Sequence, residues 1–282
     1  MTTKPVLVIG GTGKTGRRVV RLLRERGVPA RPASRSGEVR FDWLDESTWG
    51  PALDGASGVY IVQNDGDPRT RALVRTAVAS GVQRLALLSA RGVDTPGYYG
   101  EDPATSEAFL EGEAAVRESG VDWTVLRPGW FAQNFDEGFF NEGVLAGELR
   151  LPAGDGAASW IDVEDIAAVA VAALTEDGHA GRTYELSGPA PLPLAEVLSV
   201  IVEAAAGRKV RYTPLTTEEF IAELGAQGIP AEEAGLWAAA LYPVERGFES
   251  KVSDGVRQAL GRAPRTFAEY AEAAVAEGAW RD

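Results

Sequence analysis

The sequence from Val6 to Val20, VLVIGGTGKTGRRVV, constrains the fold more than any other stretch of the chain. An apolar run typical of a strand is followed at once by Gly10, Gly13 and Gly16, spaced G-x-x-G-x-x-G, and then by a helical run. In such a unit the glycines allow a tight turn, a close approach of the backbone to a pyrophosphate, and close packing of helix on strand. The free N–H groups of the helix N-terminus then point at the phosphates. The stretch therefore predicts a dinucleotide-binding turn.

The letters GTGKT also resemble the lysine end of an ATP-binding loop. That loop requires G-x-x-x-x-G-K-[ST], so a glycine must stand five residues before Gly13. Val8 occupies that position, inside the apolar run. The spacing therefore excludes this kind of mononucleotide loop and leaves the dinucleotide interpretation.

Strands and helices alternate along the first half of the chain. Continuously apolar runs, typical of strands covered on both faces, are separated by helical runs, which predicts βαβ units and a parallel sheet. The apolar runs are VLVIG, Val59–Gln63, Leu85–Ala90 and Trp123–Pro128, and the helical runs are Arg17–Arg26, Arg69–Ser80 and Ser106–Ser119.

The rhythm changes after Pro128 to aromatic and glycine-rich segments and then mostly to helices, one of them begun by a capping-box pattern at Thr216 and Glu219. We expect an α/β fold, a Rossmann-type doubly wound parallel sheet with a smaller, mostly helical C-terminal substrate lobe. Residues 1–130, completed by about 159–188, are expected to form the NAD(P)-binding domain. Residues 131–158 and 189–282 are expected to form the lobe, with a ligand cleft between the two parts.

Composition narrows the classes of function. The chain of 282 residues has no cysteine and a single histidine, so disulfides and thiolate nucleophiles are excluded and we expect no metal site. A formal charge of −13 argues against direct nucleic-acid binding. No apolar run reaches about 18 residues and no leader precedes the first strand, so we expect a cytoplasmic protein without a membrane span, either monomer or homodimer.

The residue that meets the adenine ribose, about 20 positions past the glycines, distinguishes the two dinucleotides, since an acid there selects NAD. Here the region reads ARPASRS, with Arg35 at that position and no acid before Glu38. A guanidinium pairs with a 2′-phosphate, so NADP(H) is favoured over NAD(H), unless Arg35 simply faces solvent. Lys14 either adds a second charge near the same phosphate or is solvated. Asp42 and Trp43 are expected to border the adenine.

Several blocks across nearly the whole chain resemble the NmrA-like group of atypical short-chain dehydrogenase/reductases, within it the branch of NADPH-dependent quinone oxidoreductases and triphenylmethane reductases. The most specific is LRPGWFAQNF, ending at Phe135, because that branch carries an LR-x-G-W-[YF]-x-x-N-[YF] segment after the sheet. The others are GGTGKTGRRVV, WIDVEDIAAVAVAAL, GHAGRTYELSGP and GRAPRTFAEY. In the segment LRPGWFAQNF, the branch usually has Asn directly after the arginine, whereas this chain has Pro128 there.

The resemblance implies roles for individual residues. Trp130, Phe131 and Phe135 would offer a flat apolar wall, which suits a planar acceptor. Asn134 either orients a substrate oxygen or forms a turn, and Trp237 either lines the pocket or belongs to the core. Implied cofactor contacts are Gly10, Thr12, Gly13, Lys14, Thr15, Gly16, Arg35, Val62, Gln63, Ser89, Ala90, Arg91, Pro128 and Gly129; implied contacts on the substrate face are Trp130, Phe131 and Asn134. The aromatic side chains themselves add Phe135 and Trp237 as candidate substrate contacts.

The proton-donating pair of short-chain reductases, a Tyr with a Lys four residues on, is missing. None of the seven tyrosines is followed by Lys at that spacing, and the helix that should carry the pair has Thr105 and Phe109 instead. A phenol without a neighbouring cation is a poor acid near neutral pH. Another donor is therefore expected, with Ser89, Tyr98, Tyr99 or water as the candidates.

The sequence favours an NADPH-dependent reductase that transfers hydride to a small conjugated or aromatic acceptor such as a quinone. Two alternatives stay open. One is a non-catalytic NADP(H)-binding redox sensor that acts on a protein partner, and the other is a biosynthetic tailoring reductase or isomerase with one complex substrate.

Overall fold

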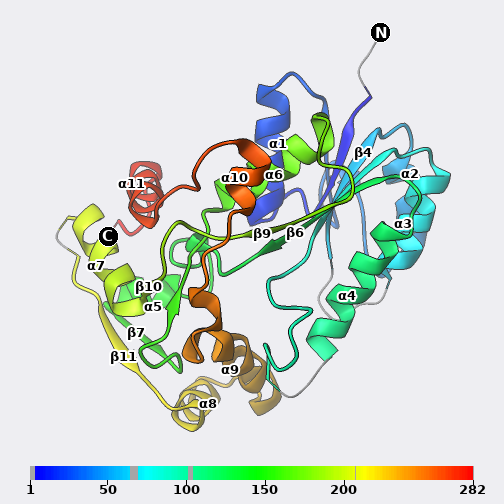
Figure 1. The fold of residues 1–282 in the computed structure, drawn as a ribbon. Coiled ribbons are helices and arrows are strands. Elements are labelled where there is room, and N and C mark those ends of the chain that lie inside the picture. Colours follow the sequence, from blue (N-terminus) through cyan, green and yellow to red (C-terminus); the bar gives the residue numbers. More distant parts are fainter. Residues whose placement is uncertain (1–3, 64–68, 101–103, 207, 282) are drawn as a thin grey trace.

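Seven parallel strands form the central sheet of the computed structural model, which describes residues 4–63, 69–100, 104–206 and 208–281. Their order is β3-β2-β1-β4-β5-β6-β9, so the direction of winding reverses between β1 and β4. Figure 1 shows this sheet with β4, β6 and β9 labelled. This confirms the doubly wound α/β fold class. The strands are β1 (Val6–Ile9), β2 (Ala30–Ser34), β3 (Val39–Arg40), β4 (Gly58–Val62), β5 (Arg84–Leu88), β6 (Asp122–Pro128) and β9 (Arg182–Leu186).

Helices cover both faces of this sheet, as its apolar strands require. Side chains alternate along β1, so Val6 and Val8 pack into one apolar cluster while Leu7 and Ile9 pack into another. The first cluster lies beneath α1 (Lys14–Glu25), α6 (Val163–Thr175) and α10 (Gly255–Leu260). The second lies beneath α2 (Trp49–Leu53), α3 (Thr70–Ala79) and α4 (Ala104–Arg117).

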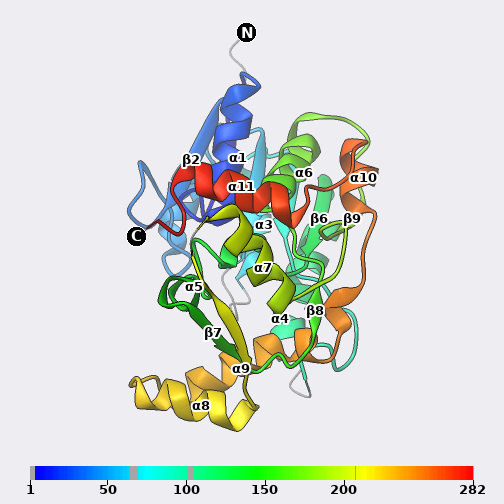
Figure 2. The same cartoon turned by 90° about the vertical axis from the view of Figure 1, so that its left-hand side faces the viewer.

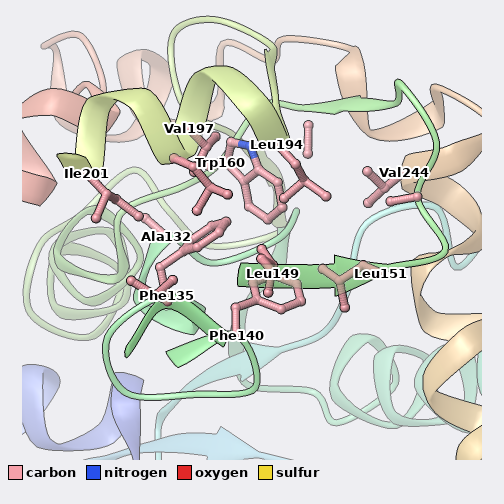
Figure 3. Packing of buried hydrophobic residues seen from close by; sticks show 14 of the residues in the cluster. Ala132, Phe135, Phe140, Leu149, Leu151, Trp160, Leu194, Val197, Ile201 and Val244 are labelled. Carbon is pink, nitrogen blue, oxygen red and sulfur yellow. The ribbon is translucent and has the colours of Figure 1, made fainter. Parts of the chain in front are cut away.

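The lobe has an apolar core of its own, built around three aromatic side chains. Phe135, Phe140 and Trp160 pack between α7 and β7 (Figure 3), and all three are almost completely buried. Figure 2 shows the pair α8 and α9 at the opposite end of the molecule from the N-terminus. The lobe consists of α5 (Asn141–Ala146), β7 (Glu148–Leu151), β8 (Ala157–Ala158), β10 (Leu192–Pro193), α7 (Leu194–Ala204), β11 (Arg211–Pro214), α8 (Thr217–Ala226), α9 (Ala231–Glu245) and α11 (Phe267–Glu277).

Local sequence signals set several helix boundaries. Thr216 and Glu219 form the expected capping box at α8, and Thr266 and Glu269 form a second one at α11. The first helix starts at Lys14, three residues before the expected Arg17, directly after the glycine turn. None of the described helices is long and apolar enough to cross a membrane.

Candidate functional site

The glycine turn between β1 and α1 leaves no room for side chains. Gly10 has a φ of +71°, in the left-handed region that favours glycine. A Cβ at Gly16 would lie 2.1 Å from the Gly10 carbonyl oxygen, and one at Gly11 would lie 2.7 Å from Pro32. Gly13 is the N-cap of α1 and provides no side-chain cap, so the first N–H groups of the helix stay available. This cradle fits the pyrophosphate of a dinucleotide.

A cavity of about 300 Å³, called here the sheet-edge cavity, lies at the carboxyl ends of β1, β2 and β4. Arg35 follows β2, is exposed, and has no ion pair among the described residues. The adjacent Ser34 Oγ is buried and has no hydrogen-bond partner there either. A cation and a hydroxyl that both lack protein partners suit a phosphate group. The lining residues are Ile9, Gly10, Ser34, Arg35, Phe41, Asp42, Trp43, Leu44, Val62 and Gln63.

Asp42 and Trp43 lie in the turn after β3 and line this cavity. Asp42 Oδ1 accepts a hydrogen bond from the Leu44 backbone N–H at 3.0 Å. Trp43 packs edge-on against Phe41, with ring centroids 5.4 Å apart. A carboxylate beside a flat indole offers the acceptor and the stacking surface that an adenine can use.

Val62 and Gln63, at the end of β4, line both the sheet-edge cavity and its neighbour. The Oε1 atom of Gln63 accepts from the Thr70 hydroxyl at 3.1 Å, while its buried Nε2 has no hydrogen-bond partner in the described part of the chain. The two cavities are therefore adjacent halves of one groove. This groove crosses the sheet where the winding reverses, the usual ligand position in doubly wound folds.

The neighbouring space, called here the interlobe cavity, measures about 410 Å³ and is mostly apolar. Trp130 and Phe131 follow β6, and Trp130 stacks on Phe140 of the lobe core with ring centroids 5.4 Å apart. Ala240 of α9 reaches the cavity from the lobe. The lining residues are Lys14, Val62, Gln63, Leu88, Ser89, Ala90, Tyr99, Phe109, Pro128, Gly129, Trp130, Phe131, Asn134, Ala240 and Glu249.

Ser89 is positioned by a buried ion pair between Glu113 and Arg127. Its hydroxyl donates to Glu113 Oε1 at 2.6 Å, and Arg127 donates to both oxygens of the same carboxylate at 2.7 Å. Glu113 is completely buried, and it also accepts from Arg117. Because the Ser89 proton is used in this bond, its oxygen faces the cavity as an acceptor rather than as an acid.

The two candidate tyrosines also use their hydroxyl protons within the protein. Tyr98 donates to Glu249 Oε1 at 2.7 Å and does not line the cavity, whereas Tyr99 lines it but donates to the Arg91 carbonyl oxygen. Burial raises the pKa of both phenols above the ordinary value. Neither hydroxyl is a ready acid for a bound acceptor.

Glu249 is a cavity residue that the sequence did not reveal. It lies in the 3-10 helix Phe248–Ser250, directly after left-handed Gly247, and is 3% exposed. Its Oε2 is buried and forms an ion pair with Arg91 Nη1 at 3.5 Å. No local motif marks this position, because Glu249 reaches the groove only through the packing of the lobe on the sheet.

Lys14 faces the interlobe cavity rather than the surroundings of Arg35. Its ammonium group donates to Asn134 Oδ1 at 2.8 Å, which joins the start of α1 to the segment after β6. Burial lowers the pKa of this lysine. Of the two alternatives for Lys14, simple solvation is replaced by this contact with the lobe segment, and a phosphate contact stays a prediction.

Other candidate residues lie outside the cavity walls. Phe135 is fully buried in the lobe core, and Trp237 lines a separate cavity of about 470 Å³, where it packs edge-on against Phe139. Arg91 is buried and donates to the Lys251 carbonyl oxygen at 2.9 Å. Thr12 is exposed at the glycine turn, and Thr15 is buried in the first turn of α1.

Phe109 lines the interlobe cavity from α4, at the place where the lysine of a Tyr–Lys pair is expected. The side chain of Thr105 lies outside what the structure describes. Phe109 therefore gives this wall of the cavity an apolar ring.

Comparison with known proteins gives concordant results. A sequence model of the NAD(P)H-binding family matches residues 10–177. The NAD(P)H azoreductase of Xenophilus azovorans is 35% identical over 285 residues, covering 95% of this chain and 97% of that enzyme. An NADPH-dependent quinone oxidoreductase of Escherichia coli, solved with NADPH, is similar in structure with a TM-score of 0.80 at 24% identity, covering 96% of this chain and 99% of that one. Nmra, a negative transcriptional regulator solved with NAD, gives a TM-score of 0.72 at 18% identity, covering 96% and 95%.

Proposed function

The chain belongs to the NAD(P)H-binding family and is an NAD(P)H-dependent oxidoreductase, and from this premise we propose that it is an NADPH-dependent reductase of small conjugated or aromatic acceptors such as quinones. The observation that carries the proposal is the groove itself. Its sheet-edge cavity offers unpartnered polar groups, whereas its interlobe cavity offers apolar and aromatic walls. A charged dinucleotide needs the polar surface of the sheet-edge cavity, and a flat acceptor needs the apolar surface of the interlobe cavity beside it.

The preference for NADPH rests on Arg35 and Ser34. Both lie at the end of β2, both lack partners among the described residues, and no acid stands between Arg35 and Glu38. An acid near the ribose would repel a 2′-phosphate, whereas a guanidinium binds it through charge-assisted hydrogen bonds. The pair therefore supports NADPH over NADH.

The residues of the interlobe cavity orient the reactants and exclude water. Bound NADPH supplies the hydride, so the protein needs only to hold the nicotinamide against the acceptor. Ser89 and Gln63 present an acceptor oxygen and an unpartnered amide donor, respectively, which suit the carboxamide of a nicotinamide. Trp130 and Phe131 give the acceptor a flat face to lie on.

Similar proteins support the same acceptor class. The Xenophilus enzyme is named for azo compounds and the Escherichia coli enzyme for quinones, and both classes of acceptor are flat and conjugated. An apolar cavity of about 410 Å³ is of the size that holds such molecules.

The test is cofactor oxidation by the purified protein. We expect NADPH absorbance to fall when quinones, azo dyes, enones or imines are added, with quinones and azo dyes fastest. NADH is expected to be used less efficiently. Protein that binds NADPH but oxidises it with no member of this panel would contradict the proposal and favour a cofactor sensor.

A further inference from the structure

A second apolar hollow lies beside the interlobe cavity. It is the cavity of about 470 Å³ that Trp237 lines, called here the lobe cavity, and it lies between α5, β7, α8 and α9 (Figure 2). Its apolar walls include Phe139, Leu149, Leu224 and Trp237, and Phe139 is 38% exposed. An exposed aromatic ring in a hollow of this size is a surface that a flat apolar group can cover.

The lobe cavity and the interlobe cavity approach each other closely at Gly138. Gly138 lines the lobe cavity, and a Cβ on it would clash with Lys14 Nζ and lie 3.0 Å from Asn134 Oδ1. Both Lys14 and Asn134 line the interlobe cavity. On α9, Trp237 lines the lobe cavity and Ala240, three residues later, lines the interlobe cavity, so the two side chains are neighbours on one helix face. One molecule can therefore extend from the first cavity into the second.

Consecutive aromatic contacts join the walls of the two cavities. Trp130, at the interlobe cavity, stacks on Phe140 with ring centroids 5.4 Å apart. Phe139 contacts Phe140 at 5.4 Å and packs edge-on against Trp237 at 4.8 Å. The same aromatic core thus presents Trp130 to one cavity, and Phe139 and Trp237 to the other. Each cavity offers an aromatic surface for one ring of a bound molecule.

The charged residues that line the lobe cavity indicate what kind of group it holds. They are Glu142, Glu148, Glu223 and Arg150, so carboxylates outnumber cations. Arg150 donates to Glu223 at 2.5 Å and to Glu148 at 3.2 Å, so its charge is already used within the protein. This excess of acid disfavours an anionic occupant, and the apolar walls favour an uncharged one.

We propose that the lobe cavity is a second acceptor subsite, which holds an uncharged aromatic group of an extended acceptor while the reducible group lies in the interlobe cavity. The inference rests on the proposed function and narrows its substrate class to acceptors with two rings, such as diaryl azo compounds and aryl-substituted quinones. Hydride transfer still takes place in the interlobe cavity. The lobe cavity supplies binding energy at a distance from the reacting bond, which raises kcat/KM for the extended acceptor.

A single-ring quinone fits within the interlobe cavity alone, so its reduction is independent of the lobe cavity. The test therefore compares unsubstituted benzoquinone with the same quinone carrying a phenethyl group. Because the chain has no cysteine, neither quinone alkylates a thiol of the protein during the assay.

The variant fills the lobe cavity without removing a packed side chain. Ala146 is exposed at the end of α5 and lines this cavity, so Ala146→Phe places a ring in the proposed subsite. The matched control is Ala222→Phe, the same change at an exposed residue of α8 that does not line either cavity.

We expect the wild type to have a kcat/KM about 10-fold higher for the phenethyl quinone than for benzoquinone, because one more ring is buried. Ala146→Phe should lose this preference and keep the wild-type kcat/KM for benzoquinone, and Ala222→Phe should behave as the wild type does. Equal use of the two quinones by the wild type, or equal losses for both in Ala146→Phe, overturns the subsite and leaves the proposed function standing. A wild type that oxidises NADPH with neither quinone contradicts the proposed function instead.

A binding measurement tests the subsite without turnover. Calorimetric titration of the NADP⁺-bound protein with 4-aminoazobenzene, an uncharged two-ring compound, should give a dissociation constant about 10-fold higher for Ala146→Phe than for the wild type. Ala222→Phe should match the wild type. The same affinity in all three proteins would mean that the second ring lies outside the lobe cavity, and the proposal would be wrong.

Discussion

The two ends of the groove are built from different parts of the chain. The sheet-edge cavity is lined by residues between Ile9 and Gln63, all at or just after strand ends of the sheet. The interlobe cavity draws on residues from Lys14 to Glu249, including α4 and α9. One end is therefore fixed by a local βαβ unit, while the other depends on how the lobe packs against the sheet. Substitutions at the two ends should therefore affect different steps, cofactor binding at one and acceptor use at the other.

The largest effect is expected from Gly16→Ala, which fills the glycine turn. The added Cβ would lie 2.1 Å from the Gly10 carbonyl oxygen, so the turn must open. We expect the free energy of unfolding to fall by about 2–3 kcal/mol, and NADPH and NADH affinity to fall together by about 100-fold. Denaturant unfolding and calorimetric titration measure both. Gly50→Ala, where a Cβ meets nothing, is the control, and intact cofactor binding in Gly16→Ala would contradict the assigned turn.

Arg35→Glu should impair NADPH binding at the sheet-edge cavity and leave the interlobe cavity unchanged. Loss of a charge-assisted hydrogen bond and its replacement by a like charge should weaken NADPH about 10- to 100-fold and leave NADH nearly unchanged. Dissociation constants for both cofactors test this, with Arg24→Glu, the same charge change on the exposed side of α1, as control. An equal loss for both cofactors would mean that Arg35 does not face the ribose phosphate.

Phe131→Ala should impair use of the acceptor in the interlobe cavity and leave cofactor binding at the sheet-edge cavity intact. Removing the ring takes away apolar area and a stacking face, so we expect kcat/KM for a quinone to fall about 10-fold. NADPH affinity should stay within about twofold, because the phosphate contacts lie elsewhere. Phe139→Ala, outside this cavity, is the control. A loss of cofactor binding without an effect on the acceptor would reassign the residue to the nicotinamide.

The smallest expected effect concerns pH and the segment that joins β6 to the lobe. Burial raises the pKa of Asp136 to about 6, from an ordinary 3.8. The folded state thus binds this proton more tightly than the unfolded state, so the stability it contributes is full below pH about 4 and is lost as pH rises through about 6. Asp136→Asn should therefore raise the free energy of unfolding by roughly 1–2 kcal/mol at pH 8 and change it little near pH 4.

Urea unfolding of the wild type and Asp136→Asn at the two pH values checks this. The amide can still accept the bond that Tyr270 donates at 2.7 Å. Equal stability of the two proteins at pH 8 would show that the carboxylate is adequately solvated or paired in the folded state.

The sequence predicted the fold and the family because their signals are local. The apolar runs and the glycine turn each lie within a few neighbouring residues, and the doubly wound sheet and the membership of an NAD(P)H-binding family are confirmed. The interlobe end was harder to predict. The sequence left Lys14 between a phosphate contact and solvent, whereas in the structure it binds Asn134, since the direction of a helix's first turn is set by what packs on it. Glu249 gave no signal, because its place at the cavity arises from the packing of two segments that are distant in the sequence.

Ala240 gives the groove a simple route to new acceptors during evolution. It is where α9 meets the interlobe cavity, and its side chain is a single methyl group. A larger residue there would select narrower acceptors, and a polar residue would favour acceptors that carry a complementary hydrogen-bonding group. Neither change touches the glycine turn, Arg35 or Ser34. A substitution at this one position of the lobe can therefore change the range of acceptors while the cofactor-binding residues stay unchanged.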